Sequence, residues 1–242
     1  MPSTDKPGSL AAIDVLILCG GLGSRLRPVI PDRPKVLAPL GGKPFLDILV
    51  EDLVRQGLRR IILCVGHLKE QIIARYSHRD EAEFLISQED VPLGTGGAVR
   101  NALPLIRSNP FLVMNGDSLC RVEFDKFYRF HLDKSAAASL VLTAPDSRHD
   151  AGTVRLNKAQ QIQSFAEKTA PHGAERFVNA GIYLLQAGSV GLQHLAPPFS
   201  LEYDVFPALV KEKPCFGFVV SSRLVDIGTP ERYSKANEDY RQ

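Results

Sequence analysis

Residues 15–35 combine an apolar run with glycines and cations, which together suit the binding of phosphate groups. The run Val15–Leu18 is typical of a buried strand, and the glycines follow it directly. Glycines let the backbone approach an anion closely, and successive N–H groups in such a turn form an anion-binding nest. The residues that could bind phosphate or a nucleotide here are Leu18, Gly20, Gly21, Gly23, Ser24, Arg25 and Lys35. The stretch therefore predicts a phosphate or nucleotide site, and a tight turn between a strand and a helix is the structural alternative.

The glycine pattern differs from the two most common nucleotide-binding motifs. A P-loop requires G-x-x-x-x-G-K-[ST], and this stretch has no lysine at the required place. The dinucleotide fingerprint G-x-G-x-x-G begins at Gly21-Leu22-Gly23 but lacks its third glycine. The residues therefore indicate a nucleotide site of another kind.

The same stretch resembles the signature of sugar-phosphate nucleotidyltransferases, G-G-x-G-[ST]-R-L-x-P-x-T-x-x-x-P-K. The matching residues are LCGGLGSRLRP and Pro34-Lys35, and the departure is the segment Val29–Arg33, which has no threonine. With Gly42–Leu46 after it, this departure most resembles the D-glycero-α-D-manno-heptose 1-phosphate guanylyltransferase branch. Members of the family join a sugar 1-phosphate to a nucleoside triphosphate and release pyrophosphate. The resemblance extends from residue 13 to about residue 240 and implies catalytic roles for Arg25 and Lys35.

Length and composition fit one α/β domain or two small ones, and we expect a single domain over residues 1–242. Of the 242 residues, 44% are hydrophobic, which is enough for a sizeable core. The net charge of +2 and the lack of a basic block argue against nucleic-acid binding. The four cysteines are widely spaced without a C-x-x-C pattern, so we expect buried, reduced thiols in a cytoplasmic protein.

The amino-terminal residues 1–12 have no apolar run long enough for a signal peptide or a membrane span, and we expect a flexible lead-in. The expected partners are therefore small-molecule substrates, with no membrane and no nucleic acid. The sequence leaves open whether the chain forms a homo-oligomer.

Apolar runs alternate with amphipathic segments in the first half, which predicts a doubly wound, mostly parallel sheet of Rossmann-like type. Strands are expected at 15–18, 61–65, 84–86 and 110–114, and helices at 45–54, 67–76 and 95–103. Short strands at 136–143, 152–156, 162–165 and 177–185 predict a small antiparallel region, with a last helix at 230–240 capped by Thr229. We expect residues 13–135 to bind the nucleotide and residues 136–242 to bind the sugar phosphate.

Two aspartates far apart in the sequence are candidates for a metal site. Asp117 follows the strand predicted at 110–114, and α/β proteins bind ligands beyond the carboxyl ends of parallel strands. A carboxylate beside triphosphate oxygens is a usual way to hold Mg²⁺. Asn115-Gly116-Asp117 resembles the family's N-G-D, and Asp226 lies in a match to D-x-G-T-P, so the resemblance implies that both aspartates hold one Mg²⁺ and that Asn115 and Gly116 contact the nucleotide. From the residues alone, each aspartate could equally cap a strand end or form a turn.

The segment Gln88–Gly97 resembles the part of the family that recognises the base, where glycines bring backbone groups to the base edge. Guanine offers two adjacent donors, N1–H and the N2 amine, and a carboxylate can accept both. Uracil and thymine offer one donor between two acceptors, which suits an amide. Glu89 therefore favours GTP, with Gly94 and Thr95 beside the nucleotide. The preference would not follow if Gln88 faced the base or if both were solvated loop residues.

The sugar side is implied mainly by resemblance. Phe165-Ala166-Glu167-Lys168 resembles F-x-E-K, in which the lysine binds the sugar phosphate, and Asn179 lies in a match to N-x-G-I-Y. Glu167 and Asn179 would then bind sugar hydroxyls, and Gly152 would precede the strand that closes on the sugar. Glu202 could reach the sugar, but we favour for Glu202 and Asp204 a role as helix N-terminal charges beside Ser200.

These residues predict an enzyme that joins a sugar 1-phosphate to a nucleoside triphosphate, with D-glycero-α-D-manno-heptose 1-phosphate and GTP as the preferred substrates. The alternatives are a mannose 1-phosphate guanylyltransferase and a relative that uses UTP or dTTP. A non-catalytic regulator that binds nucleotide sugars is the alternative from another class. The charged residues at the catalytic positions favour the enzyme.

Overall fold

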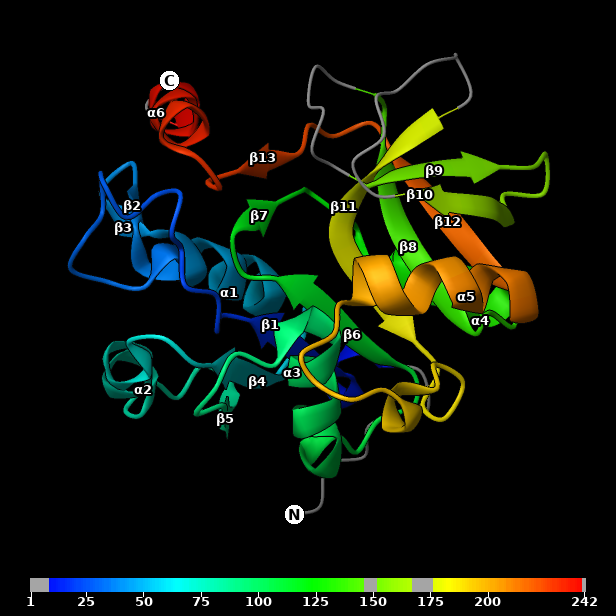
Figure 1. The fold of residues 1–242 in the computed structure, drawn as a ribbon, viewed down its shortest axis with the longest axis horizontal. Helices are drawn as coiled ribbons and strands as arrows, with labels where there is room; N and C mark the ends of the chain where they lie inside the picture. The colour runs from blue at the N-terminus through cyan, green and yellow to red at the C-terminus, as the bar shows by residue number, and fades with distance from the viewer. Residues whose placement is uncertain (1–8, 146–151, 167–175, 241–242) are drawn as a thin grey trace.

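The computed structural model describes residues 9–145, 152–166 and 176–240, and its centre is a nine-stranded sheet (Figure 1). Seven strands follow the order β10-β9-β11-β6-β1-β4-β5, while β8 pairs with β11 and β12 pairs with β8. The strands are β1 (Asp14–Leu18), β4 (Arg60–Val65), β5 (Glu83–Gln88), β6 (Phe111–Asn115), β8 (Ala138–Thr143), β9 (Thr153–Leu156), β10 (Ile162–Ala166), β11 (Arg176–Leu185) and β12 (Cys215–Val220).

The first four of these strands are parallel, and their register aligns their carboxyl ends. Leu18 on β1 lies opposite Cys64 on β4 and Asn115 on β6, and Cys64 lies opposite Ser87 on β5. The segments that leave these strands therefore begin at one edge of the sheet. The inner strands β1, β4 and β6 are buried on both faces, so their sequences are mainly apolar runs, whereas β5 at the edge of the sheet is only partly buried.

The strand β11 joins the parallel strands to the antiparallel region that the sequence predicts. It pairs antiparallel with β6, β8 and β9, and β9 in turn pairs antiparallel with β10. The strand β12 was not expected, and it pairs parallel to β8. The α/β fold with an added antiparallel region is therefore confirmed, and the sheet has one more parallel pair than expected.

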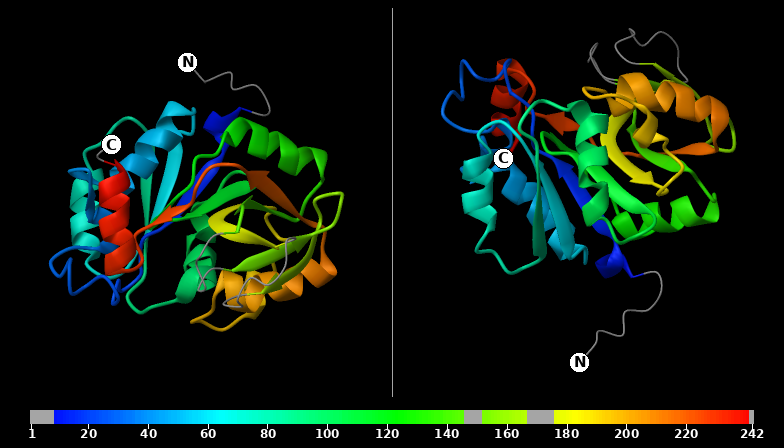
Figure 2. Two further views of the ribbon diagram at one scale, coloured as in Figure 1. Left: turned by 90° about the horizontal axis from the view of Figure 1, so that it is seen from above. Right: turned by 60° about the horizontal axis from the view of Figure 1, so that its bottom comes forward.

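Helices cover both faces of the sheet and produce two apolar cores. Val15 and Ile17 face the core formed with α1, α2, α4 and α6, whereas Leu16 faces the core formed with α3 and α5. The red helix α6 lies on the same side of the sheet as the blue and cyan helices of the first half, as the left view of Figure 2 shows. The helices are α1 (Phe45–Arg55), α2 (Lys69–Tyr76), α3 (Gly94–Ala102), α4 (Phe124–Asp133), α5 (Phe206–Glu212) and α6 (Pro230–Tyr240). No helix among the described residues is both long and apolar enough to cross a membrane.

Two small ribbons join distant parts of the chain. The strand β7 (Ser118–Leu119) pairs with β13 (Val225–Asp226), and β2 (Pro39–Leu40) pairs with β3 (Lys43–Pro44). After β13, Thr229 accepts a hydrogen bond from the N–H of Arg232 and so caps α6 as the sequence predicts. The hydroxyl of Tyr233 on α6 donates to the carbonyl of Pro39 at 2.6 Å, which holds the end of the chain against the first half.

A buried ion pair fixes the amino-terminal end of β1, opposite to the edge where the parallel strands end. Asp14 is 1% exposed and contacts the guanidinium of Arg60 on β4, which also donates to Glu83 at 3.1 Å. The second carboxylate oxygen of Asp14 accepts the N–H groups of Arg107 at 2.5 Å and Ser108 at 2.7 Å. The pair therefore joins β1 and β4 to the loop before β6.

We expect Asp14→Ala to lower the free energy of unfolding by about 3 kcal/mol, because it leaves the buried Arg60 without its main partner. Glu51→Ala is the control, since it breaks the exposed pair between Lys43 and Glu51 and should cost less than about 1 kcal/mol. Urea unfolding measures both losses. Equal losses would show that the Asp14 network stabilises the fold no more than a surface pair does.

Candidate functional site

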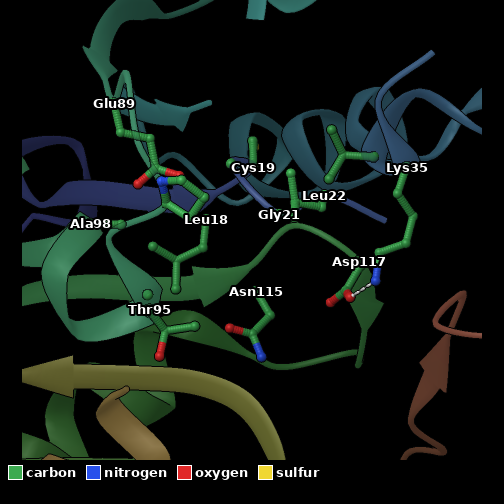
Figure 3. A pocket seen from close by; sticks show the side chains of 14 residues that line it. Leu18, Cys19, Gly21, Leu22, Lys35, Glu89, Thr95, Ala98, Asn115 and Asp117 are labelled. Atoms are coloured by element: carbon green, nitrogen blue, oxygen red, sulfur yellow. Dashed lines mark hydrogen bonds and ion pairs between the residues drawn. The ribbon is translucent and has the colours of Figure 1, made fainter. Parts of the chain in front are cut away.

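A cavity of about 280 Å³ opens where β1, β5 and β6 end (Figure 3). Glu89 lies at one end of this nucleotide cavity, and the pair formed by Lys35 and Asp117 lies at the other. Leu18 and Asn115 lie between them. The register of the parallel strands thus gathers residues that are up to about a hundred positions apart in the sequence into one elongated site.

The carboxylate of Glu89 occupies space that two glycines leave open. A Cβ atom at Gly20 would lie 2.5 Å from Oε1 of Glu89, and one at Gly66 would lie 2.7 Å from the same oxygen. Gly20 follows β1 and Gly66 follows β4, so the side chain lies across the ends of two neighbouring strands. Gly66 escaped the sequence analysis, although it follows an apolar run just as Gly20 does.

Burial raises the pKa of Glu89 above its ordinary value, and a hydrogen bond from the backbone of Leu93 opposes only part of this effect. The carboxylate therefore takes up a proton more readily than an exposed glutamate would. Gln88, the neighbouring candidate, is exposed and does not line the cavity.

Lys35 and Asp117 form a contact at the far end of the nucleotide cavity. Lys35 begins a short 3₁₀ turn (Lys35–Leu37), and its ammonium group contacts Oδ2 of Asp117. Burial raises the pKa of Asp117, but Lys35 and a hydrogen bond from Ser118 outweigh this, so that the pKa lies below its ordinary value. Gly23 has a φ of +61°, and a Cβ there would lie 3.2 Å from the Cβ of Lys35. A glycine at this position therefore avoids backbone strain and a close contact with the lysine side chain.

A second cavity of about 240 Å³ adjoins the first and shares three lining residues with it, Thr95, Asn115 and Asp117. Arg25 and Asn179 line only this second cavity. A ligand in one cavity would therefore lie beside a ligand in the other, with Asp117 at their junction. This is the geometry that a reaction between two bound substrates requires.

Asp226 lies close to Asp117 because β13 pairs with β7. Asp226 is opposite Ser118 in that ribbon, and the N–H of Ile227 donates to the carbonyl of Asp117 at 3.1 Å. Asp226 also accepts hydrogen bonds from the N–H of Gly228 at 2.9 Å and from Arg232 at 3.3 Å. The two aspartates therefore line one cavity.

The structure brings most of the predicted site residues to these two cavities. Those that line the nucleotide cavity are Leu18, Gly20, Gly21, Lys35, Glu89, Gly94, Thr95, Asn115 and Asp117. Those that line only the second cavity are Arg25, Gly152, Asn179 and Asp226. Gly23, Ser24 and Gly116 line neither, and Glu167 and Lys168 lie outside the described residues. The N–H of Gly116 instead donates to the carbonyl of Leu18 at 3.0 Å and joins β6 to β1.

The glycines that begin α3 make room for a neighbouring segment that contains Phe199. The N–H groups of Gly96 and Gly97 donate to the carbonyl of Phe199 at 3.0 and 3.3 Å. A Cβ at Gly94 would lie 2.3 Å from that carbonyl oxygen, and one at Gly96 would lie 2.5 Å from the Phe199 ring. Gly94 lines the nucleotide cavity, whereas Gly96 and Gly97 bind Phe199 and line neither cavity, so of these three glycines only Gly94 is placed to contact a nucleotide.

Glu202 is a cavity residue that the sequence analysis assigned to a helix end. Asp204 does lie at that helix end, where its carboxylate accepts a hydrogen bond from the N–H of Ser200 at 2.7 Å. Glu202 is only 9% exposed, lines the second cavity and accepts hydrogen bonds from the hydroxyls of Thr95 and Tyr183. Thr95 is 107 residues away from it in the sequence, so no local pattern could reveal this contact.

Known proteins resemble this chain over nearly its whole length. The family model for nucleotidyl transferases matches residues 14–242. This chain belongs to the nucleotidyl transferase family. A D-glycero-alpha-D-manno-heptose 1-phosphate guanylyltransferase from Aneurinibacillus thermoaerophilus is 32% identical, over 94% of this chain and 98% of its own length. A mannose-1-phosphate guanylyltransferase from Mycobacterium tuberculosis is 29% identical, over 94% of this chain and 64% of its own length.

Solved structures show the same similarity. The crystal structure of HddC from Yersinia pseudotuberculosis superposes with a TM-score of 0.81 at 33% identity. The superposition covers 94% of this chain and 99% of the HddC chain. HddC has also been solved in complex with GMP-PN, and that structure superposes with a TM-score of 0.80. These comparisons confirm the family, the fold and the enzyme class that the sequence predicts, a sugar-phosphate nucleotidyltransferase.

We expect Gly94→Ala to lower the free energy of unfolding by about 2–4 kcal/mol, since it adds strain at positive φ and an overlap with Phe199. Gly188→Ala is the matched control, because Gly188 has a φ of +79° and nothing within 4 Å of the added Cβ. It should show the strain alone, about 1 kcal/mol. The difference between the two losses, measured by urea unfolding, gives the free-energy cost of the overlap with Phe199. Equal losses would mean that Phe199 moves aside without destabilising the protein.

Proposed function

We propose that this enzyme transfers the guanylyl group of GTP to D-glycero-α-D-manno-heptose 1-phosphate and releases pyrophosphate. The heptose 1-phosphate guanylyltransferase at 32% identity supports the sugar, and the position of Glu89 carries the choice of base. The second candidate is transfer to mannose 1-phosphate, because a relative of that name is 29% identical.

The base would bind at the Glu89 end of the nucleotide cavity. Guanine N1–H and the N2 amine could both donate to this carboxylate, in a charge-assisted pair that uracil and thymine cannot form. The carboxylate faces the cavity at the end opposite to Lys35, which leaves the length of the cavity for ribose and phosphates. The exposed position of Gln88 supports Glu89 as the residue that contacts the base.

The chemical step would take place where the two cavities meet. A phosphate oxygen of the sugar 1-phosphate attacks the α-phosphorus, forming a new O–P bond. The bond from that phosphorus to the oxygen that bridges to the β-phosphate breaks, and pyrophosphate leaves with the electron pair. The attacking oxygen is already ionised, so the enzyme needs no general base. Arg25 and Lys35 would stabilise the negative charge, and catalysis is mainly positioning and electrostatics.

The residues at the junction fit a Mg²⁺ ion. Asp117 and Asp226 supply two carboxylates in one cavity, and Mg²⁺ commonly takes one or two carboxylates and completes its shell with water and substrate phosphates. The described part of the chain has no group of three or more His, Cys, Asp or Glu that could hold a metal by itself. Mg²⁺ bound here would supply positive charge beside the triphosphate.

The sugar phosphate would bind in the second cavity. We assign sugar contacts to Gly152 and Asn179, which line it, and to Glu167. Lys168 would bind the sugar phosphate group and align it for attack. In this division, residues 13–135 bind mainly the nucleotide and residues 136–242 bind mainly the sugar phosphate.

We place the enzyme in the cytoplasm. Its four cysteines are free and buried, and thiols remain reduced in that compartment. Nucleoside triphosphates are also made and held there.

We expect pyrophosphate release with GTP and D-glycero-α-D-manno-heptose 1-phosphate, and loss of this activity when EDTA removes divalent metal. The assay pairs GTP, ATP, CTP, UTP and dTTP with the heptose, mannose and glucose 1-phosphates. Activity only with GTP and mannose 1-phosphate would support the choice of base and reject the heptose as the substrate. Preference for UTP or dTTP would reject Glu89 as the residue that selects the base.

Glu89→Gln is expected to raise the KM for GTP about a hundredfold, because the amide cannot accept both guanine donors and a charge-assisted pair is worth about 3 kcal/mol. The preference for GTP over UTP should fall at the same time. Gln88→Ala is the matched control and should leave the KM for GTP unchanged. A large effect of Gln88→Ala with none from Glu89→Gln would assign the base to Gln88.

The raised pKa of Glu89 also predicts a pH dependence. Protonation removes an acceptor that guanine needs, so the KM for GTP should rise as the pH falls. Because burial raises this pKa, the rise should begin at a higher pH than for an exposed glutamate. The pH profile of the KM for GTP in the wild type, compared with that of Glu89→Gln, measures the effect. Parallel profiles would exclude Glu89 as the titrating group.

A further inference from the structure

A buried hydrogen-bond network joins the two cavities through Glu202. This glutamate lies in a π-helical turn (Leu201–Val205), and three hydroxyl groups donate hydrogen bonds to its carboxylate. The hydroxyl of Thr95, which lines both cavities, donates to Oε2 of Glu202 at 2.7 Å, and the hydroxyl of Ser200 donates to the same oxygen at 2.8 Å. Oε2 therefore has both of its acceptor positions filled.

The other carboxylate oxygen contacts a tyrosine that lines neither cavity. The hydroxyl of Tyr183 lies 3.1 Å from Oε1 of Glu202 and 2.8 Å from Nδ2 of Asn179. An amide nitrogen only donates, so the tyrosine oxygen accepts from Asn179 and its single proton points to Glu202. Oδ1 of Asn179 accepts the N–H of Gly181 at 3.1 Å, which fixes the orientation of the amide.

Counting acceptors shows what Glu202 still lacks. Oε1 receives one hydrogen bond, from Tyr183, and a carboxylate oxygen can accept two. Glu202 lines the second cavity although it is 9% exposed, and the cavity is where its remaining acceptor position can be reached. A ligand group that fills this acceptor position must be a hydrogen-bond donor. A hydroxyl is such a group, and it is neutral like the three hydroxyls that already donate to Glu202.

We propose that Glu202 accepts a hydrogen bond from a ring hydroxyl of the sugar phosphate, and that Tyr183 is the positioning residue that holds Glu202 and Asn179 for this contact. The inference rests on the proposed function, since it takes the second cavity to bind the sugar. Asn179 keeps one amide proton and one carbonyl lone pair beyond its two internal contacts. Together the two side chains present acceptors and a donor, which is the pattern that neighbouring hydroxyls of a pyranose require.

The role of Tyr183 follows from its burial and packing. Its ring is fully buried and packs against Phe206 with the ring centroids 4.8 Å apart, so the hydroxyl has little freedom to move. Replacement by phenylalanine keeps this packing and removes only the oxygen. Both Glu202 and Asn179 then lose a contact that fixes their orientation, while the lining of each cavity stays the same.

Tyr183→Phe should raise the KM for the sugar 1-phosphate about tenfold, the effect of one lost hydrogen bond, with less than about a twofold change in the KM for the nucleoside triphosphate. Tyr76→Phe is the matched control, because Tyr76 is also buried and its hydroxyl donates to a buried carboxylate, that of Asp47, at 2.8 Å. It should lower the stability without changing the KM for the sugar. Equal changes in the KM for the sugar in the two variants would overturn the positioning role.

Glu202→Gln identifies the contact with the hydroxyl directly. The amide oxygen would have to serve Thr95 and Ser200, so its NH₂ group would replace the acceptor at Oε1. We expect the KM for the sugar 1-phosphate to rise at least about tenfold. With the deoxy analogue that lacks the contacted hydroxyl, wild type and Glu202→Gln should instead have equal KM values. The same ratio of KM values for the parent sugar and for every deoxy analogue would overturn the contact.

The wild type separates this inference from the proposed function. If it releases no pyrophosphate with any pairing of substrates, the proposed function fails and this inference fails with it. If it turns over while Tyr183→Phe and Glu202→Gln keep the wild-type KM for the sugar, only this inference fails. Circular dichroism and thermal unfolding of each variant show whether a change in KM comes from a folded protein.

Discussion

The parallel register of β6, β1, β4 and β5 is the constraint on which both cavities depend. Leu18 is opposite Cys64 and Asn115, and Cys64 is opposite Ser87, so the chain leaves four neighbouring strands at one level. Gly20, Glu89 and Asp117 follow the ends of β1, β5 and β6 within a few residues, and this register brings them together. The buried pair of Asp14 and Arg60 fixes β1 to β4 at the opposite end, where it supports the register without touching the site.

Two glycines without side chains, Gly20 and Gly66, leave the space in which the carboxylate of Glu89 lies. The sequence analysis took Gly20 as a residue that lets phosphate approach the backbone. The structure adds a second role, since a side chain at Gly20 or Gly66 would overlap the carboxylate. The same principle operates at Gly94 and Gly96, where the missing side chains admit Phe199 and so bring Glu202 to the second cavity. Glycines at strand and helix ends thus shape this site largely by leaving space for neighbouring groups.

Local patterns predicted the fold to the extent that one segment carried its own signal. The runs at 61–65 and 110–114 are continuous and apolar, so the parallel core was predictable, as was α6 from Thr229 and Pro230. The strand β12 escaped prediction because its place depends on pairing with β8, and Gly217 in its middle, where a Cβ would overlap Leu142, weakens its strand pattern. The helix α4 carries charged residues between Phe124 and Phe127, which obscured a helical spacing that the sequence does contain.

The candidate site divides in the same way. Lys35, Asp117 and Asp226 lie in motifs that a sequence displays, whereas the environment of Glu202 is made by Thr95 and Tyr183, which come from other elements. Its donors are hydroxyl groups, and this matters for what Glu202 can do. A lysine or arginine partner would neutralise the carboxylate and fill its acceptor positions, but hydroxyls satisfy it only in part and leave its negative charge. A buried carboxylate held by hydroxyls and open to a cavity is thus prepared for one more neutral donor, which is what a sugar offers.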